Sequence, residues 1–196
     1  MNVEGKRKAP ADAGAGNAHP EESDRAHLMK QRIEDLTIEL LVRQGYQGFR
    51  FQDIADALNI TRTAIHYYCG SKEQLCETVI VSYVSTLLAG WERNWTEDKP
   101  FEAKICGMME ANRARFLAFN EDLHGGNSWS LISRMRSDRD QIGPQARAAV
   151  INFGNDLERI IVDAVDQAVA RGEYRSDIPR RDVALQLVAI ADSAGA

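Results

Sequence analysis

The chain has 196 residues, of which 44% are hydrophobic and 27% are charged, and its net charge is −5 with a pI of about 5.4. These values are typical of a globular protein with one domain of ordinary size, or two small ones that share a core. They exclude a protein whose whole surface is a basic footprint for nucleic acid, although a local basic patch is compatible with an acidic total.

Three features of the sequence favour a soluble, cytoplasmic protein. Cys69, Cys76 and Cys106 are odd in number and lack the spacing of a metal site or a redox motif, so we expect buried free thiols in a reducing compartment. The N-terminal segment lacks the charged-then-apolar pattern of a secretory signal. The longest nearly apolar run, 79–91, is shorter than the roughly 20 residues that span a bilayer.

Residues 1–23 are rich in Ala, Gly, Pro and charged side chains and contain almost nothing apolar. A segment of this composition cannot bury a core, so we expect a disordered arm. Its basic run, Lys6, Arg7 and Lys8, has two interpretations, a contact with DNA phosphates or a solvated tail.

Helical periodicity begins at Asp24. Ile33, Leu36 and Leu40 recur on one face of a first helix, and Gly45 is expected to end it. No part of this region shows the alternation of apolar and polar residues that an exposed strand has, so the N-terminal part is expected to be entirely helical.

Local signals then predict a short second helix, a tight turn and a third helix. Asn59 tolerates the left-handed backbone that a tight turn needs, Thr61 is a good N-cap, and Ile65 faces the core. Ser71-Lys72-Glu73-Gln74 is a capping box that begins a long fourth helix toward Trp91.

Helical patterns continue after Pro100, at 101–119, 129–135, 144–171 and from about 179 to the end, with "HGGN" at 124–127 as a break. The last block is apolar on nearly every side, which is more than one packing face requires. The sequence therefore predicts an all-α protein without internal repeats.

The segment "GYQGFRFQDIADALNITRTAIHYYCGSKEQL" joins two short helices by a tight turn, which is the helix-turn-helix pattern. It resembles the DNA-binding domain of the tetracycline-repressor (TetR) family of transcriptional regulators over roughly residues 31–88. The positions that carry the resemblance are Gly45-Tyr46, Ile54-Ala55, Ile60, Ile65, and Ser71-Lys72-Glu73 with Leu75. Arg50, Asn59 and the run His66-Tyr67-Tyr68-Cys69 depart from the residues that are common in the family.

The resemblance implies three segments, namely the arm at 1–23, an N-terminal three-helix helix-turn-helix DNA-binding head at 24–70, and a C-terminal helical ligand-binding and dimerisation domain at 71–196. It implies a repressor that binds a near-palindromic operator as a homodimer, through helices at about 144–171 and 179–196, and is released by a small-molecule effector. The chain stops at "IADSAGA", where many family members continue, so a shortened dimer helix is an open alternative. Activation in place of repression is also open.

In this family the recognition helix and the start of the fourth helix touch DNA, and those positions fall here on Arg62, Thr63, Ala64, His66, Tyr67, Tyr68 and Lys72. Their chemistry fits that role. An arginine at the start of a recognition helix can pair with guanine O6 and N7, and threonine and alanine methyl groups suit the thymine methyl. Histidine, tyrosine and lysine side chains suit phosphates, and a helix start favours anions. The alternatives are a solvated Arg62, a structural His66, a Tyr68 that braces the head, and a surface Lys72.

A set of bulky or polar residues recurs on the inward stripes of the central helices. These residues are Trp91, Trp95, Met108, Asn112, Phe116, Phe119 and Trp129. They form either plain core or a ligand pocket with aromatic walls. Asn112 is the strongest sign of a pocket, because a buried amide needs a partner.

Two other functional classes compete with this interpretation. An enzyme is disfavoured because the chain has no phosphate loop, nucleophile elbow or His-x-x-x-His pair, and we expect no cofactor and no metal. A DNA-bound adaptor, whose C-terminal domain binds a protein and no small-molecule inducer, has the same head and stays open. A packed C-terminal core would favour the adaptor, and a cavity with polar anchors would favour ligand control.

Overall fold

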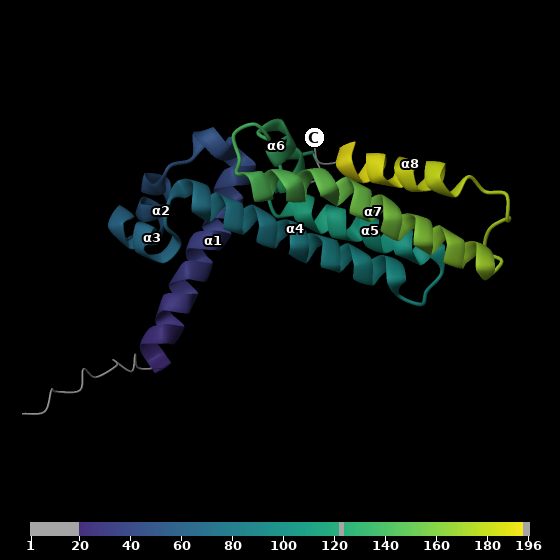
Figure 1. Cartoon of the computed structure of the whole chain (residues 1–196), viewed down its shortest axis with the longest axis horizontal. Coiled ribbons are helices and arrows are strands. Elements are labelled where there is room, and N and C mark those ends of the chain that lie inside the picture. The colour runs from purple at the N-terminus through teal and green to yellow at the C-terminus, as the bar shows by residue number, and fades with distance from the viewer. Residues whose placement is uncertain (1–19, 122–123, 194–196) are drawn as a thin grey trace, which may run out of the picture.

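The structure, a computed structural model, describes residues 20–121 and 124–193, and within them it contains eight helices and no strand (Figure 1). The helices are α1 (Pro20–Gly48), α2 (Phe51–Leu58), α3 (Arg62–Cys69), α4 (Lys72–Thr96), α5 (Phe101–Leu117), α6 (Leu131–Ser137), α7 (Pro144–Ala170) and α8 (Arg180–Ser193). The expected all-α class, with an N-terminal helix-turn-helix and a C-terminal helical domain, is confirmed.

The head consists of α1, α2 and α3 at one end of an elongated molecule (Figure 1). Ile33 of α1, Ile54 of α2 and Ile65 of α3 have no exposed surface, and they hold the three helices together. Burying side chains of this size stabilises a fold by about 1.5–3 kcal/mol each. The head therefore has a small core of its own beneath the outer face of α3.

The C-terminal domain is a bundle in which α4 and α7 form the central pair (Figure 1). Glu77 at the start of α4 accepts a hydrogen bond from the backbone N–H of Gln145 at the start of α7, at 2.7 Å, so these two helices begin at the same end. At the opposite end, Glu173 accepts a hydrogen bond from the Phe101 N–H at 2.7 Å and thereby caps α5. Polar caps thus fix both ends of the bundle around an apolar middle.

A short helix, α6, joins the head to the bundle. Gly45, where the sequence predicted the end of the first helix, interrupts α1 with φ 74° and ψ 177°, and α1 continues to Gly48. The residue after Gly45, Tyr46, donates its N–H to Asp138 after α6 at 2.8 Å. A Cβ atom at Gly45 would lie 2.7 Å from the side chains of both Arg134 and Asp138. Only glycine combines the positive φ with this close approach.

Two expectations from the sequence are wrong. Helix α1 begins at Pro20, inside the segment expected to be disordered, because proline suits the first helical position and the acidic residues that follow suit a helix start. Residues 1–19 lie outside the described residues. Cys106 is exposed and Cys69 is half-buried, so only Cys76 is the buried free thiol that we expected of all three.

Candidate nucleic-acid interface and ligand pockets

Helix α3 is held in place by the local signals in its sequence. Asn59 adopts the left-handed conformation (φ 54°, ψ 47°) that turns the chain after α2. The Thr61 hydroxyl accepts a hydrogen bond from the Ala64 N–H at 3.1 Å and caps α3. Ser71 and Gln74 form the predicted capping box at the start of α4. These caps fix the direction of α3 with respect to α2 and α4.

The outer face of α3 is exposed. Arg62, Thr63, His66 and Tyr67 are all exposed, and Tyr67 is 84% accessible. Within the described part of the chain, neither Arg62 nor Tyr67 makes a hydrogen bond or an ion pair. Because none of those described residues uses these polar groups, they are available to an external partner.

Ala64 and Tyr68 are half-buried and lie at the edges of this face. The Tyr68 ring packs edge-on against the Tyr67 ring, with 5.3 Å between the centroids, and it also touches the hydrophobic core. Tyr68 therefore supports Tyr67 from the side of the core.

His66 is partly committed to the protein. Its Nδ1 lies 3.0 Å from the Gly70 carbonyl oxygen, and since a carbonyl can only accept, Nδ1 carries the proton. The ring also packs edge-on against Phe51, with 4.8 Å between the centroids. Its Nε2 is the ring nitrogen that remains for an external contact.

Lys72 makes interactions that the sequence did not reveal. Its Nζ donates a hydrogen bond to the Phe49 carbonyl oxygen at 2.7 Å and lies 4.5 Å from the centroid of the Phe49 ring. It also lies 4.9 Å from the centroid of the Tyr46 ring. Lys72 therefore ties the start of α4 to the segment between α1 and α2. An ammonium group has three donors, so two of them are left for a phosphate.

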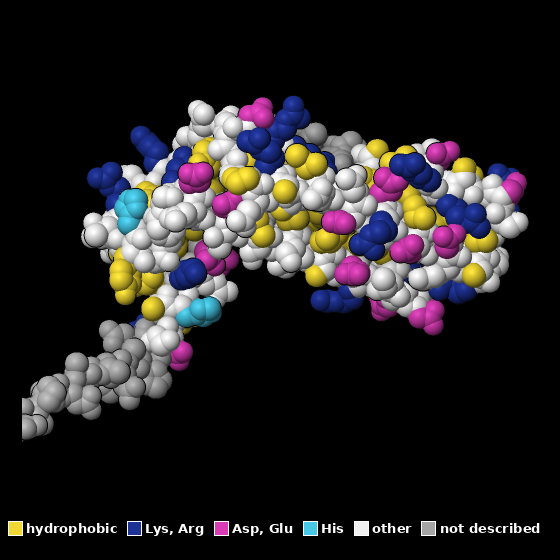
Figure 2. All heavy atoms as spheres, in the orientation of Figure 1, with side chains coloured by type: hydrophobic (Ala, Val, Ile, Leu, Met, Phe, Trp, Pro, Cys, Tyr) yellow, Lys and Arg dark blue, Asp and Glu magenta, His cyan; other side chains and the backbone are white. Residues whose placement is uncertain are grey.

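Charges of both signs are distributed over the molecule. On the face shown in Figure 2, Lys and Arg side chains lie among Asp and Glu side chains over both the head and the bundle. Residues 24–70 contain six Lys or Arg and six Asp or Glu residues, whereas the whole chain has a net charge of −5. The head is therefore less acidic than the rest of the protein.

The seven residues expected to line a pocket are divided among several environments. Trp95 and Met108 are buried in the core, where Trp95 packs against Phe101 with 5.5 Å between the ring centroids, and neither borders a described pocket. The other five border two surface grooves and one inner cavity. These five are Trp91, Asn112, Phe116, Phe119 and Trp129.

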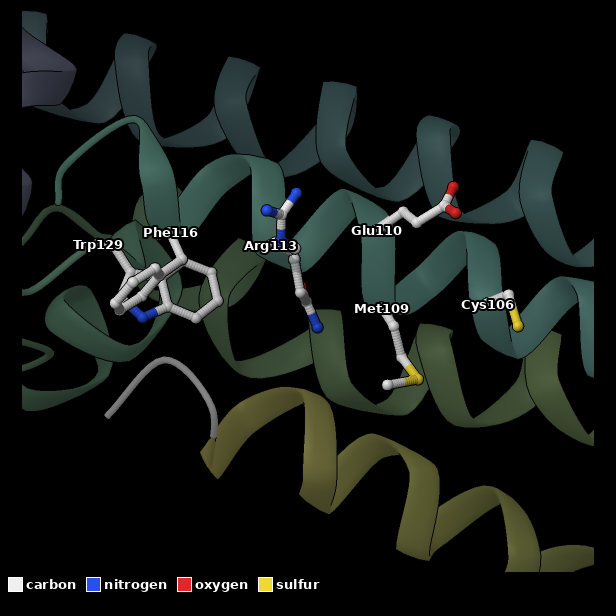
Figure 3. A pocket seen from close by; sticks show the side chains of 7 residues that line it. Cys106, Met109, Glu110, Arg113, Phe116 and Trp129 are labelled. Atoms are coloured by element: carbon white, nitrogen blue, oxygen red, sulfur yellow. The ribbon is translucent and has the colours of Figure 1, made fainter. Parts of the chain in front are cut away.

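The first groove, which we call the α5 groove, has a volume of about 540 Å³. Figure 3 shows Phe116 and Trp129 together at one end, Arg113 in the middle, and Glu110, Met109 and Cys106 toward the other end; the lining also includes Asn112. The Phe116 and Trp129 rings lie edge-on, with 6.0 Å between their centroids. The groove is open, since 61% of the Met109 side chain is accessible.

The second groove, the α4–α5 groove, has a volume of about 440 Å³. Its lining consists of Tyr83, Thr86, Leu87, Gly90, Trp91, Asn94, Gly107, Ala111, Arg115, Ala118 and Phe119. The inner cavity behind it shares Tyr83, Leu87, Trp91 and Arg115 but has a volume of only about 30 Å³. This is room for little more than water, whereas both grooves have the size of small-molecule sites.

The sequence did not point to Arg115, because a charged residue on a helix is normally solvated. In the structure Arg115 is half-buried, its Nη2 donates to Asn112 Oδ1 at 2.5 Å, and its guanidinium carbon lies 4.8 Å from the centroid of the Trp91 ring. Asn112, expected to seek a ligand, thus has a protein partner. The only available sequence signal was the three-residue spacing of Asn112 and Arg115 on one helix.

No helix among the described residues is long and apolar enough to cross a membrane.

Comparisons with known proteins agree with this geometry. Residues 33–79 match the family described as "Bacterial regulatory proteins, tetR family". A TetR transcriptional regulator from Chloroflexus aurantiacus J-10-FL is similar in structure, with a TM-score of 0.70 and 20% identity over 88% of this chain and 84% of that one. A TetR-family regulator from Agrobacterium tumefaciens has a TM-score of 0.70 and 17% identity, over 86% of this chain and 85% of that one.

A gamma-butyrolactone receptor (ArpA-like protein) is also similar, with a TM-score of 0.64 and 18% identity over 86% of this chain and 78% of that one. At these identities the likeness to solved structures concerns the fold. No curated protein sequence matches the chain.

Proposed function

The chain belongs to the tetR family of bacterial regulatory proteins, and from this membership we propose that it is a ligand-responsive repressor that binds a near-palindromic operator as a homodimer. It would act in the cytoplasm, where bacterial DNA lies. The observation that carries the proposal is the exposed face of α3, on which Arg62 and Tyr67 make no hydrogen bond or ion pair within the described residues. A recognition helix needs such unoccupied side chains on the face that meets DNA.

Each of the side chains expected to touch DNA has a defined role in this proposal. Arg62, the first residue of α3, makes a bidentate contact with guanine, while Thr63 and the Ala64 methyl group contact thymine methyl groups. His66 and Tyr67 bind phosphates, with Tyr68 behind Tyr67, and Lys72 contributes a further phosphate contact from the start of α4. The balanced charge of residues 24–70 supports this, because the acidic charge lies mainly elsewhere.

Dimerisation supplies the spacing that a palindrome needs. The helices α7 and α8 carry exposed apolar side chains, among them Ile151 and Leu185, which are 54% and 43% accessible. A second copy that covers these side chains would remove apolar surface from water. Two copies of α3 about 34–36 Å apart fit successive turns of the major groove.

Ligand control is supported by the two grooves in the C-terminal domain, which have the size of small-molecule sites. A structural neighbour is named a receptor for gamma-butyrolactone, so a similar fold serves a small-molecule receptor there. Release from DNA requires that the ligand bind better to a form whose heads are wrongly spaced, since equal affinity for both forms would shift nothing.

A mobility-shift assay on DNA upstream of the protein's own gene and neighbouring genes tests the proposal. Arg62→Ala should relax selectivity at one base pair per half-site, at a cost of about 1–3 kcal/mol in discrimination. Arg93→Ala, which removes an exposed arginine at the far end of α4, is the matched control and should change nothing. A binding-site selection in which Arg62→Ala retains the parent's preference would refute the guanine contact. An operator complex that compounds fail to release would favour the adaptor.

A further inference from the structure

Arg115 is a cation in the bundle to which no carboxylate of the described residues supplies a counter-charge. It lies on α5 and is half-buried between Trp91 and Asn112. In the part of the chain that the structure describes, no carboxylate forms an ion pair with it. A cation that is partly removed from water without an anion is unfavourable unless something else compensates.

The guanidinium group retains most of its hydrogen-bonding capacity. Of its five N–H donors, residues 20–121 and 124–193 engage one, which binds Asn112 Oδ1. Burial lowers the pKa of Arg115, and the nearby Tyr83 opposes that change, but an arginine stays protonated at neutral pH. The remaining donors form a planar fork, which matches two oxygens of one anionic group.

The surroundings of Arg115 select both the charge and the shape of a ligand. The α4–α5 groove contains Arg115 but no Asp or Glu, and most of its wall is apolar, including Leu87, Trp91 and Phe119. The α5 groove differs, because Glu110 and Arg113 place both signs of charge on it. Of the two grooves, only the α4–α5 groove therefore combines a cation with an uncharged, largely apolar wall.

We propose that the α4–α5 groove binds a small amphipathic organic anion, a carboxylate or sulfonate on an apolar body, whose anionic group pairs with Arg115. The apolar body lies along Leu87 and Phe119, in a groove whose volume of about 440 Å³ suits a ligand of one to three rings. This inference rests on the proposed ligand control for its biological meaning, but the binding itself does not require DNA.

Two dyes of nearly the same shape test the charge selection on the DNA-free protein. The anionic probe is 1-anilinonaphthalene-8-sulfonate, and the neutral probe is N-phenyl-1-naphthylamine, which lacks the sulfonate. Both fluoresce in apolar sites, so titrations give a dissociation constant for each. We expect the wild-type protein to bind the sulfonate at one site per chain, and more tightly than the neutral dye.

Three variants locate the site. Arg115→Met should raise the dissociation constant of the sulfonate about tenfold to a hundredfold and leave that of the neutral dye unchanged, because a hydrogen-bonded charge pair is lost. Gly90→Leu should raise the dissociation constants of both dyes. A Cβ at Gly90 meets no heavy atom within 4 Å, so the leucine side chain can fill the groove without a clash. Arg93→Met, which removes an exposed arginine outside the groove, should affect neither dye.

Unchanged sulfonate binding in Arg115→Met overturns the anion site, and unchanged binding of both dyes in Gly90→Leu overturns the groove. Circular dichroism reports whether the Arg115→Met protein is folded. If that protein is not folded, the Gly90→Leu variant shows whether the dyes bind in the α4–α5 groove. Operator binding is measured separately by mobility shift. A protein that binds the sulfonate through Arg115 but binds no DNA would refute the proposed regulator and keep the anion site. A protein that binds operator DNA but does not bind the sulfonate through Arg115 would refute the anion site and keep the proposed regulator.

Discussion

Replacing Lys72 separates two roles that the structure allows, a bond within the head and a contact with DNA. The Nζ atom donates to the Phe49 carbonyl oxygen at 2.7 Å and lies within 5 Å of two aromatic ring centroids, at 4.5 Å for Phe49 and 4.9 Å for Tyr46. A hydrogen bond from a charged donor contributes about 1.5–3 kcal/mol, and a partly exposed cation–π contact about 0.5–1 kcal/mol. Because these contributions overlap, we expect Lys72→Ala to lower the free energy of unfolding by about 2–4 kcal/mol.

Urea denaturation of three variants measures this cost. Lys72→Met keeps most of the aliphatic stem and should show the part of the loss that comes from the charge. Lys30→Ala is the matched control, because Lys30 is exposed and its contact with Glu34 spans 3.8 Å. An exposed pair of this kind contributes about 0–1 kcal/mol. If Lys72→Ala were as stable as the control, the assigned bond to Phe49 would be refuted.

The DNA contact of Lys72 is measured on the same variants under conditions where the head is folded. The logarithm of the binding constant is plotted against the logarithm of the salt concentration. Loss of one phosphate contact should flatten this slope by roughly one unit per half-site, with affinity reduced alike for all sequences. A destabilised but folded Lys72→Met protein with an unchanged slope would assign Lys72 to the structure of the head alone.

Two further predictions concern polar links in the protein. Asp138→Ala should lower the free energy of unfolding by about 1.5–3 kcal/mol in urea, because the charge-assisted bond from the Tyr46 N–H is lost, whereas the exposed Asp140→Ala should lie within about 0.5 kcal/mol of wild type. The hydrogen bond from the Phe101 N–H, and after it the one from Arg171, holds the pKa of Glu173 below its ordinary value. The contribution of Glu173 to stability is therefore present above the pKa that this carboxyl has in the unfolded chain, and it is lost as the pH falls through its pKa in the folded protein. The stability gap between wild type and Glu173→Gln should therefore narrow from pH 5 toward pH 3 in parallel denaturation series; a constant gap would contradict the cap.

The head could be predicted from the sequence because its signals are local. Asn59 adopts the left-handed turn, Thr61 caps α3, and the Ser71–Gln74 box begins α4, each within four residues of the group it contacts. The apolar spacing identified Ile65 as core for the same reason. A single side chain and its near neighbours in the chain were sufficient to specify each of these features.

The contacts that join distant segments could not be predicted in this way. Asp138 meets Tyr46 across 92 positions and Glu173 meets Phe101 across 72, and periodicity carries no information about such pairs. Helix α1 begins earlier than the composition predicts, because a segment poor in apolar residues favours disorder, although Pro20 and the acids after it also suit a helix start. The DNA and ligand roles of individual side chains stay predictions.

The candidate pocket shows why a stripe of residues on one helix is an insufficient description of a site. Asn112 and Phe116 lie four residues apart and border the same α5 groove, but Met108, one turn earlier, is buried in the core. Arg115 lies between Asn112 and Phe116 in sequence and faces a different groove. What a helical residue borders depends on which neighbouring helix covers its turn, and that is decided by the packing of α4 and α7 against α5.

Helix α4 physically connects the two candidate sites, and its geometry sets the scale of any coupling between them. It begins at Lys72 beside the head, and residues 83–94 of the same helix line the α4–α5 groove. At a rise of 1.5 Å per residue, its 25 residues extend about 37 Å, so a tilt of about 4° about one end displaces the other by about 2.5 Å. That displacement approaches the length of the Lys72–Phe49 hydrogen bond. A ligand that pushes α4 away from Arg115 can therefore change the position of the head without any larger rearrangement of the bundle, provided that it binds the tilted form more tightly.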